Sequence, residues 1–147
     1  MSALTGSAAP PSVLPLAASF PPPPPSFHPL AALDSVPVGV SKATLPPGSA
    51  DEPLVVVREA SGALHVMHGL CAHKQGELHL GDLEEIGGKL CLTCPRHRKK
   101  FPGGLSFNVR SGAAVVKAEP LPEACYDPSW TVGVRETVVR DGWIFYK

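Results

Sequence analysis

Two short motifs constrain this chain more than any other feature. Cys71 and His73 form a Cys-x-His pair, Cys94 and His97 form a Cys-Pro-x-His pair, and 20 residues, Lys74–Thr93, separate them. Each spacing lets a thiolate and an imidazole project from one tight loop. If the two loops lie at the tips of adjacent hairpins, their four side chains converge. The motifs therefore predict one metal centre with two sulfur and two nitrogen ligands.

The donor set alone leaves two kinds of centre open. Two Cys and two His can hold a tetrahedral Zn²⁺ ion, or a [2Fe–2S] cluster in which two His replace two Cys on one iron. The chain has two further cysteines, and without a secretory signal pattern a disulfide framework is not expected. We expect Cys91 to be a small buried side chain in a strand, and Cys125 to lie outside the site.

Short apolar runs separated by turn residues predict an all-β fold. No stretch of 11 residues carries a helical period. Gly87-Gly88 and Asp141-Gly142 are both typical of tight hairpin turns. Such a pattern indicates a small sandwich or barrel. The expected strands cover residues 54–59, 64–67, 89–92, 113–118, 132–139 and 143–146.

The N-terminal part has a different composition. Twelve of the 18 prolines fall in residues 1–50, five of them consecutive at Pro21–Pro25, and no Asp, Glu, Lys or Arg precedes Asp34. We expect residues 1–35 to form a disordered Pro-rich tail and residues 36–147 to form the folded domain. The Ser and Ala content partly fits an organelle transit peptide, although the usual arginines are missing. The predicted location is therefore intracellular, either cytoplasmic or organellar.

Taken together, the two motifs resemble those of the Rieske family, which has Cys-x-His, a spacer and Cys-Pro-x-His. The run Cys71–Glu85 looks like the eukaryotic stand-alone Rieske-domain proteins, and the resemblance covers residues 36–147. It implies a Rieske-like antiparallel β sandwich or barrel with a small cluster-binding subdomain. It also implies one [2Fe–2S] cluster, with Cys71 and Cys94 on one iron and His73 and His97 on the outer iron.

The resemblance implies electron transfer. We expect a soluble carrier between a reductase and an acceptor such as an oxygenase, because no residues remain for the mononuclear iron domain of a complete oxygenase. Zero formal net charge argues against nucleic-acid binding. The absence of a stretch of about 20 apolar residues argues against a membrane span. We also expect a monomer.

Two departures from the family bear on this prediction. Lys99 and Phe101 stand where high-potential members carry sulfur-bonding Ser and Tyr, which favours a low-potential, ferredoxin-like cluster. Residues 98–106 fit the family spacing only with an insertion of about six residues. Two alternatives stay open: a zinc-stabilised binding module with the same four ligands, and a metal-free interaction domain on the same fold.

Overall fold

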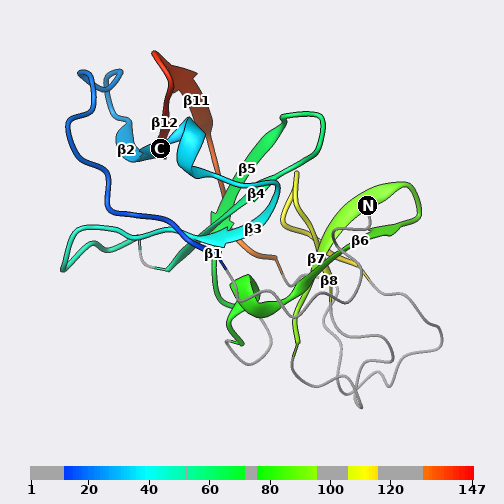
Figure 1. The fold of residues 1–147 in the computed structure, drawn as a ribbon. Coiled ribbons are helices and arrows are strands. Elements are labelled where there is room, and N and C mark those ends of the chain that lie inside the picture. Colours follow the sequence, from blue (N-terminus) through cyan, green and yellow to red (C-terminus); the bar gives the residue numbers. More distant parts are fainter. Residues whose placement is uncertain (1–11, 52, 72–75, 96–105, 116–130) are drawn as a thin grey trace.

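The computed structural model describes residues 12–51, 53–71, 76–95, 106–115 and 131–147. These residues form strands in three sheets and two short 3₁₀ segments, η2 at Leu33–Ser35 and η3 at Leu78–Leu80 (Figure 1). The all-β prediction is confirmed. No helix in the described ranges is long and apolar enough to cross a membrane.

A five-stranded sheet lies at the centre of the fold. Its strands, in spatial order, are β1 (Ser12–Val13), β3 (Gly39–Lys42), β4 (Leu54–Arg58), β5 (Leu64–His68) and β10 (Val134–Arg135). All pairs are antiparallel except β1 with β3. The hairpin predicted from residues 54–67 is confirmed as β4 and β5.

Strand β4 is buried on both faces, because the sheet is covered on both sides. Leu54, Val55, Val56 and Val57 are each 1% exposed or less. Successive side chains of a strand point to opposite faces. Leu54 and Val56 therefore belong to one apolar core, and Val55 and Val57 belong to another. An unbroken apolar run instead of an alternating one is what such a strand requires.

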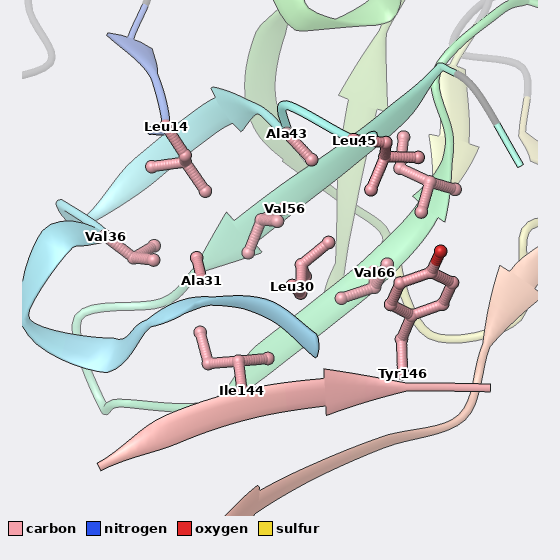
Figure 2. Close-up of a cluster of buried hydrophobic side chains, with 11 residues drawn as sticks. Leu14, Leu30, Ala31, Val36, Ala43, Leu45, Val56, Val66, Ile144 and Tyr146 are labelled. Atoms are coloured by element: carbon pink, nitrogen blue, oxygen red, sulfur yellow. The ribbon is translucent and has the colours of Figure 1, made fainter. Parts of the chain in front are cut away.

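The first core lies against a three-stranded sheet. Its strands are β11 (Thr137–Arg140), β12 (Trp143–Tyr146) and β2 (His28–Ala32), in that order. Figure 2 shows Ile144 and Tyr146 pointing from β12 toward Val56 and Val66 of the central sheet. Asp141 and Gly142, both with positive φ, make the predicted turn between β11 and β12.

The prediction of a disordered tail is wrong for residues 12–35. Strand β2 pairs with β12, and Leu14, Leu30 and Ala31 are at most 1% exposed in the first core. Partners distant in the sequence order this segment, so its lack of local period gave no signal. The domain boundary expected at residue 36 therefore lies too late. Residues 1–11 are outside the described residues, and for them disorder stays a prediction.

A four-stranded sheet packs against the other face of the central sheet. It has the order β6 (Asp82–Ile86), β7 (Lys89–Thr93), β8 (Ser106–Asn108) and β9 (Ala114–Val115). Gly87 and Gly88, with φ of 60° and 79°, form the predicted turn between β6 and β7. Leu92 and Phe107 point into the second core, together with Val55, Val57 and Met67 from the central sheet.

Candidate metal centre

The first motif begins directly beyond β5, in a loop that is closed at its base. Leu70 and Glu77 form an antiparallel bridge, and the Cys71 N–H donates to the Gly76 carbonyl at 2.8 Å. The Leu78 N–H donates to Gly69 at 2.9 Å one step further down. Cys71 is 3% exposed. The backbone thus holds its thiol at the edge of the second core.

The second motif begins at the end of β7. The cross-strand pairs Leu92–Phe107 and Thr93–Ser106 are the last before residues 94–105. Cys94 follows immediately and is 1% exposed. A two-stranded ribbon therefore supports this loop, as the first loop is supported by its own bridge.

The two cysteines belong to the same buried cluster. Cys71 and Cys94 pack in the second core with Leu78, Leu92 and Phe107. The two loops therefore enter the same apolar core at their cysteines, and the convergence of all four ligands stays a prediction. Buried thiols in an apolar environment suit a soft metal centre, which would balance the thiolate charge in place of solvent.

Gly81 lets the two ligand loops pack closely against each other. This residue follows η3, at the end of the first loop, and an added Cβ would lie 2.0 Å from the Thr93 carbonyl oxygen. Only a residue without a side chain can approach the chain so closely just before Cys94. The end of the first ligand loop, at Gly81, therefore packs directly against Thr93, the residue before the second loop.

The two histidines of the motifs, His73 and His97, lie outside the described residues, as do Cys125 and most of the expected insertion. Within the described ranges, no three His, Cys, Asp or Glu side chains are grouped closely enough to hold a metal. His79 lies in η3, where burial and then the charge of Lys42 lower its pKa. Cys91 is fully buried in β7, as expected.

A buried chain of hydroxyl groups lies behind the second loop, and sequence reasoning missed it. Thr93 Oγ1 donates to Glu84 Oε2 at 2.7 Å, and Thr93 and Ser106 hydroxyls lie 2.7 Å apart. Both Thr93 and Ser106 are fully buried. These residues are brought together only by the register of three neighbouring strands, so no local sequence motif predicts their contact.

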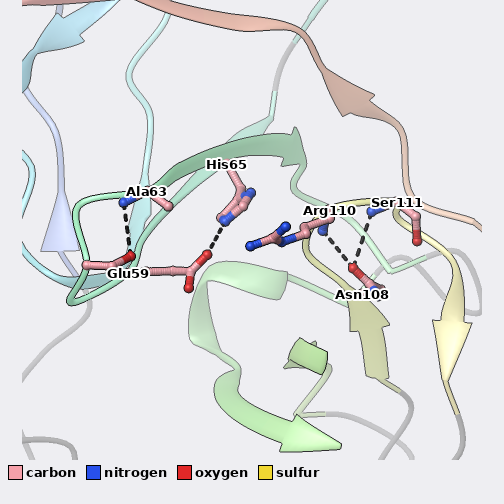
Figure 3. A network of polar contacts seen from close by, with 7 residues as sticks. Glu59, Ala63, His65, Asn108, Arg110 and Ser111 are labelled. Carbon is pink, nitrogen blue, oxygen red and sulfur yellow. Dashed lines mark hydrogen bonds and ion pairs between the residues drawn. The ribbon is translucent and has the colours of Figure 1, made fainter. Parts of the chain in front are cut away.

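A second polar group lies at the other end of the four-stranded sheet. Figure 3 shows Arg110 extending toward the paired Glu59 and His65, while Asn108 accepts hydrogen bonds from the Arg110 and Ser111 amides. A cavity of about 460 Å³ opens beside Glu59, Lys89 and Arg110. Since Lys89 and Cys94 flank opposite ends of β7, about 16 Å of strand separates this cavity from the ligand loops.

Comparison with known proteins decides the family. The family model described as Rieske [2Fe-2S] domain matches residues 29–121, which is more than half of the chain. The chain belongs to the Rieske family. The matched segment starts within β2, before the domain boundary expected at residue 36.

This Rieske protein is similar to a human protein and to two solved structures. A human Rieske domain-containing protein is 44% identical over 47 residues, which are 32% of this chain and 30% of that protein. The Sphingomonas yanoikuyae B1 ferredoxin is 25% identical with a TM-score of 0.58, covering 83% of this chain and 98% of its own. A chain from the complex of reduced oxygenase and oxidized ferredoxin in carbazole 1,9a-dioxygenase is 26% identical with a TM-score of 0.55, covering 82% and 91%.

Membership implies a [2Fe–2S] cluster and a role in electron transfer. The described residues fit such a cluster, because one cysteine from each motif is buried in the same apolar core. The polar cavity near Lys89 is at the wrong end of the sheet for the cluster. The fold class, the family and the cofactor predicted from the sequence are thus confirmed.

Proposed function

We propose that this Rieske protein is a ferredoxin-like electron carrier with a low-potential cluster held by Cys71, His73, Cys94 and His97. The observation that carries the proposal is the burial of Cys71 and Cys94, at the start of the two motifs, in the same apolar core. Each loop also supplies, in sequence, a histidine two or three residues further on. Those imidazoles would lie on the outer side of the centre.

A Rieske cluster supplies reversible one-electron transfer. The chain's own residues determine how easily it occurs. Neutral imidazole ligands add no charge, so two thiolates leave the oxidised centre neutral and the reduced centre with one negative charge. Apolar neighbours such as Leu78, Leu92 and Phe107 exclude water from the thiolate side. Exchange with a partner is then confined to the histidine side.

We further propose that the protein passes electrons from a reductase to an acceptor such as an oxygenase. The ferredoxin of the S. yanoikuyae structure is matched over 98% of its length, so this fold can form a whole carrier protein. The carbazole 1,9a-dioxygenase structure pairs a ferredoxin with its oxygenase. The proposed carrier would be monomeric and intracellular, and would have its partner surface around His73 and His97.

The ligand assignment is tested by single substitutions after anaerobic reconstitution. Cys71→Ser, Cys94→Ser, His73→Ala and His97→Ala should each lose most of the bound iron and acid-labile sulfide. Cys91→Ala is the matched control, because Cys91 is equally buried but lies outside both motifs; it should keep both. If Cys91→Ala loses the cluster while a motif variant retains it, the assignment is wrong.

The carrier role is tested by voltammetry and by coupled turnover. The low-potential proposal predicts a midpoint near the lower end of the Rieske range, at about −150 mV. With a Rieske ferredoxin reductase and NADH, the protein should pass electrons to cytochrome c. A midpoint of about +300 mV, the upper end of that range, would contradict the low-potential carrier. Bound zinc without sulfide would favour the zinc module.

A further inference from the structure

We propose that Thr93, held between Glu84 and Ser106, is a positioning residue for Cys94. The inference rests on the proposed function, because it takes Cys94 as a cluster ligand. Thr93 immediately precedes that ligand, yet its side chain points to the opposite face of the sheet. Cys94 packs in the second core, whereas Thr93 bonds to polar groups behind it.

The direction of the hydrogen bonds follows from the number of protons. A hydroxyl group has one hydrogen to donate and two lone pairs to accept. The Thr93 hydroxyl donates to the Glu84 carboxylate at 2.7 Å, so it must accept from the Ser106 hydroxyl, also 2.7 Å away. The hydrogen bonds therefore run, from donor to acceptor, from Ser106 through Thr93 to Glu84. Thr93 is the central member of this series and uses its only hydrogen.

These three hydrogen-bonded residues lie where β7 and β8 lead into the second ligand loop. Thr93 and Ser106 face one another as the last pair of β7 and β8, so their hydroxyl bond reinforces the base of residues 94–105. Glu84 extends the link to β6, and three strands are joined at one point. Both hydroxyl groups are fully buried. The bond from Thr93 to Glu84 is partly buried, and a hydrogen bond to a charged acceptor is among the stronger ones in proteins.

Thr93 is also held through its backbone, by contact with Gly81. The Thr93 carbonyl lies against Gly81, so the backbone of Thr93 has a close neighbour there, while its hydroxyl is bonded to Glu84 and Ser106. The residue that places the Cys94 sulfur is therefore fixed on both sides. Such fixed support is expected of side chains that orient a metal ligand without touching the metal. The expected consequence is a cluster that is held firmly and in a single geometry.

Two variants separate the hydroxyl group from the shape of the side chain. Thr93→Val keeps the size and β-branching but removes both hydrogen bonds, and Thr93→Ser restores a hydroxyl. We expect Thr93→Val to bind a full cluster, to lose it to a chelator about tenfold faster, and to show broadened EPR lines after reduction. Thr93→Ser should recover most of the wild-type rate and line width.

Ser106→Ala and Glu84→Gln test the two outer members of the hydrogen-bonded series Ser106–Thr93–Glu84. Ser106→Ala removes one bond and should accelerate cluster loss less than Thr93→Val does. Glu84→Gln keeps an acceptor but removes a negative charge near the cluster, so the reduction potential should rise while the rate of loss stays close to wild type. These different signatures distinguish positioning from a general loss of stability.

The matched control is Thr44→Val, in another part of the fold. It removes the hydrogen bond that the Thr44 hydroxyl donates to the Leu14 carbonyl. It should leave the release rate and the EPR line width unchanged. Equal acceleration by Thr44→Val and Thr93→Val, or no effect of Thr93→Val, would overturn the positioning role. If Thr93→Val does not fold, Ser106→Ala with normal cluster retention and line width would overturn it. A wild-type protein without a cluster would overturn both the proposed function and this inference.

Discussion

Gly81 gives the sharpest test of how the two ligand loops are held together. In Gly81→Ala, the new Cβ would lie 2.0 Å from the Thr93 oxygen, 3.0 Å from its carbonyl carbon and 3.2 Å from the Leu78 oxygen. Restoring van der Waals contact needs a displacement of roughly 1 Å or more. All of these atoms belong to the backbone, so no side chain can rotate away to make room.

The expected cost can be estimated from overpacking in protein interiors, which is typically about 1–3 kcal/mol. Gly81 has an ordinary extended backbone, with φ of −86° and ψ of −178°, so strain in its own conformation adds nothing. For a domain of this size the melting temperature should fall by roughly 5–10 °C. Because Thr93 precedes Cys94, the displaced strand should also hold the cluster less firmly.

The assay is thermal unfolding followed by circular dichroism, together with iron content after chelation. Gly133→Ala is the matched control, because no atom lies within 4 Å of the added Cβ and its φ is not in the left-handed range. The control should melt within about 1–2 °C of wild type, the shift expected for a surface substitution. If Gly81→Ala is as stable as Gly133→Ala, the close contact between the loops is refuted.

Three further predictions concern single side chains. Tyr146→Phe removes a hydrogen bond to Asp51 at 2.9 Å and should destabilise the fold by about 1.5–3 kcal/mol in urea unfolding. Burial and this bond raise the pKa of Tyr146 to about 12; its stabilising contribution should therefore persist below pH 10 and decline as the pH rises toward 12, and a flat profile would contradict this. Ser41 is fully buried, with no partner for its hydroxyl in the described part of the chain, so Ser41→Ala should leave stability unchanged or raise it by up to about 1 kcal/mol; a clear loss would reveal a partner. His97→Cys should keep an iron–sulfur centre and lower its potential, because a thiolate adds a negative charge; an unchanged or higher value in voltammetry would refute the charge argument.

Local signals predicted the hairpins well. Gly87-Gly88 and Asp141-Gly142 carry their turn geometry in their own residue types, and both turns have positive φ in the structure. The expected strand over residues 132–139 is instead divided into β10 and β11, which belong to different sheets. Its apolar residues gave no sign that the chain leaves one sheet for another.

Features that depend on distant partners were not predictable from local pattern. The segment around Leu14 and Leu30 looks like a low-complexity tail, but pairing with β3 and β12 orders it. The Glu84–Thr93–Ser106 chain likewise needs the register of β6, β7 and β8. The ligand motifs were recognisable because metal coordination requires particular residue types at short spacing, whatever surrounds them.

The cluster and its four ligands are tested most directly by the EPR spectrum of the full chain, purified without oxygen and reduced with dithionite. The proposed ligand set predicts a Rieske-type signal with a low average g-value, from about two irons and two acid-labile sulfides per chain. A signal typical of four cysteine ligands would contradict the ligand set. No signal, with about one zinc and no sulfide per chain after reconstitution, would contradict the electron-carrier function.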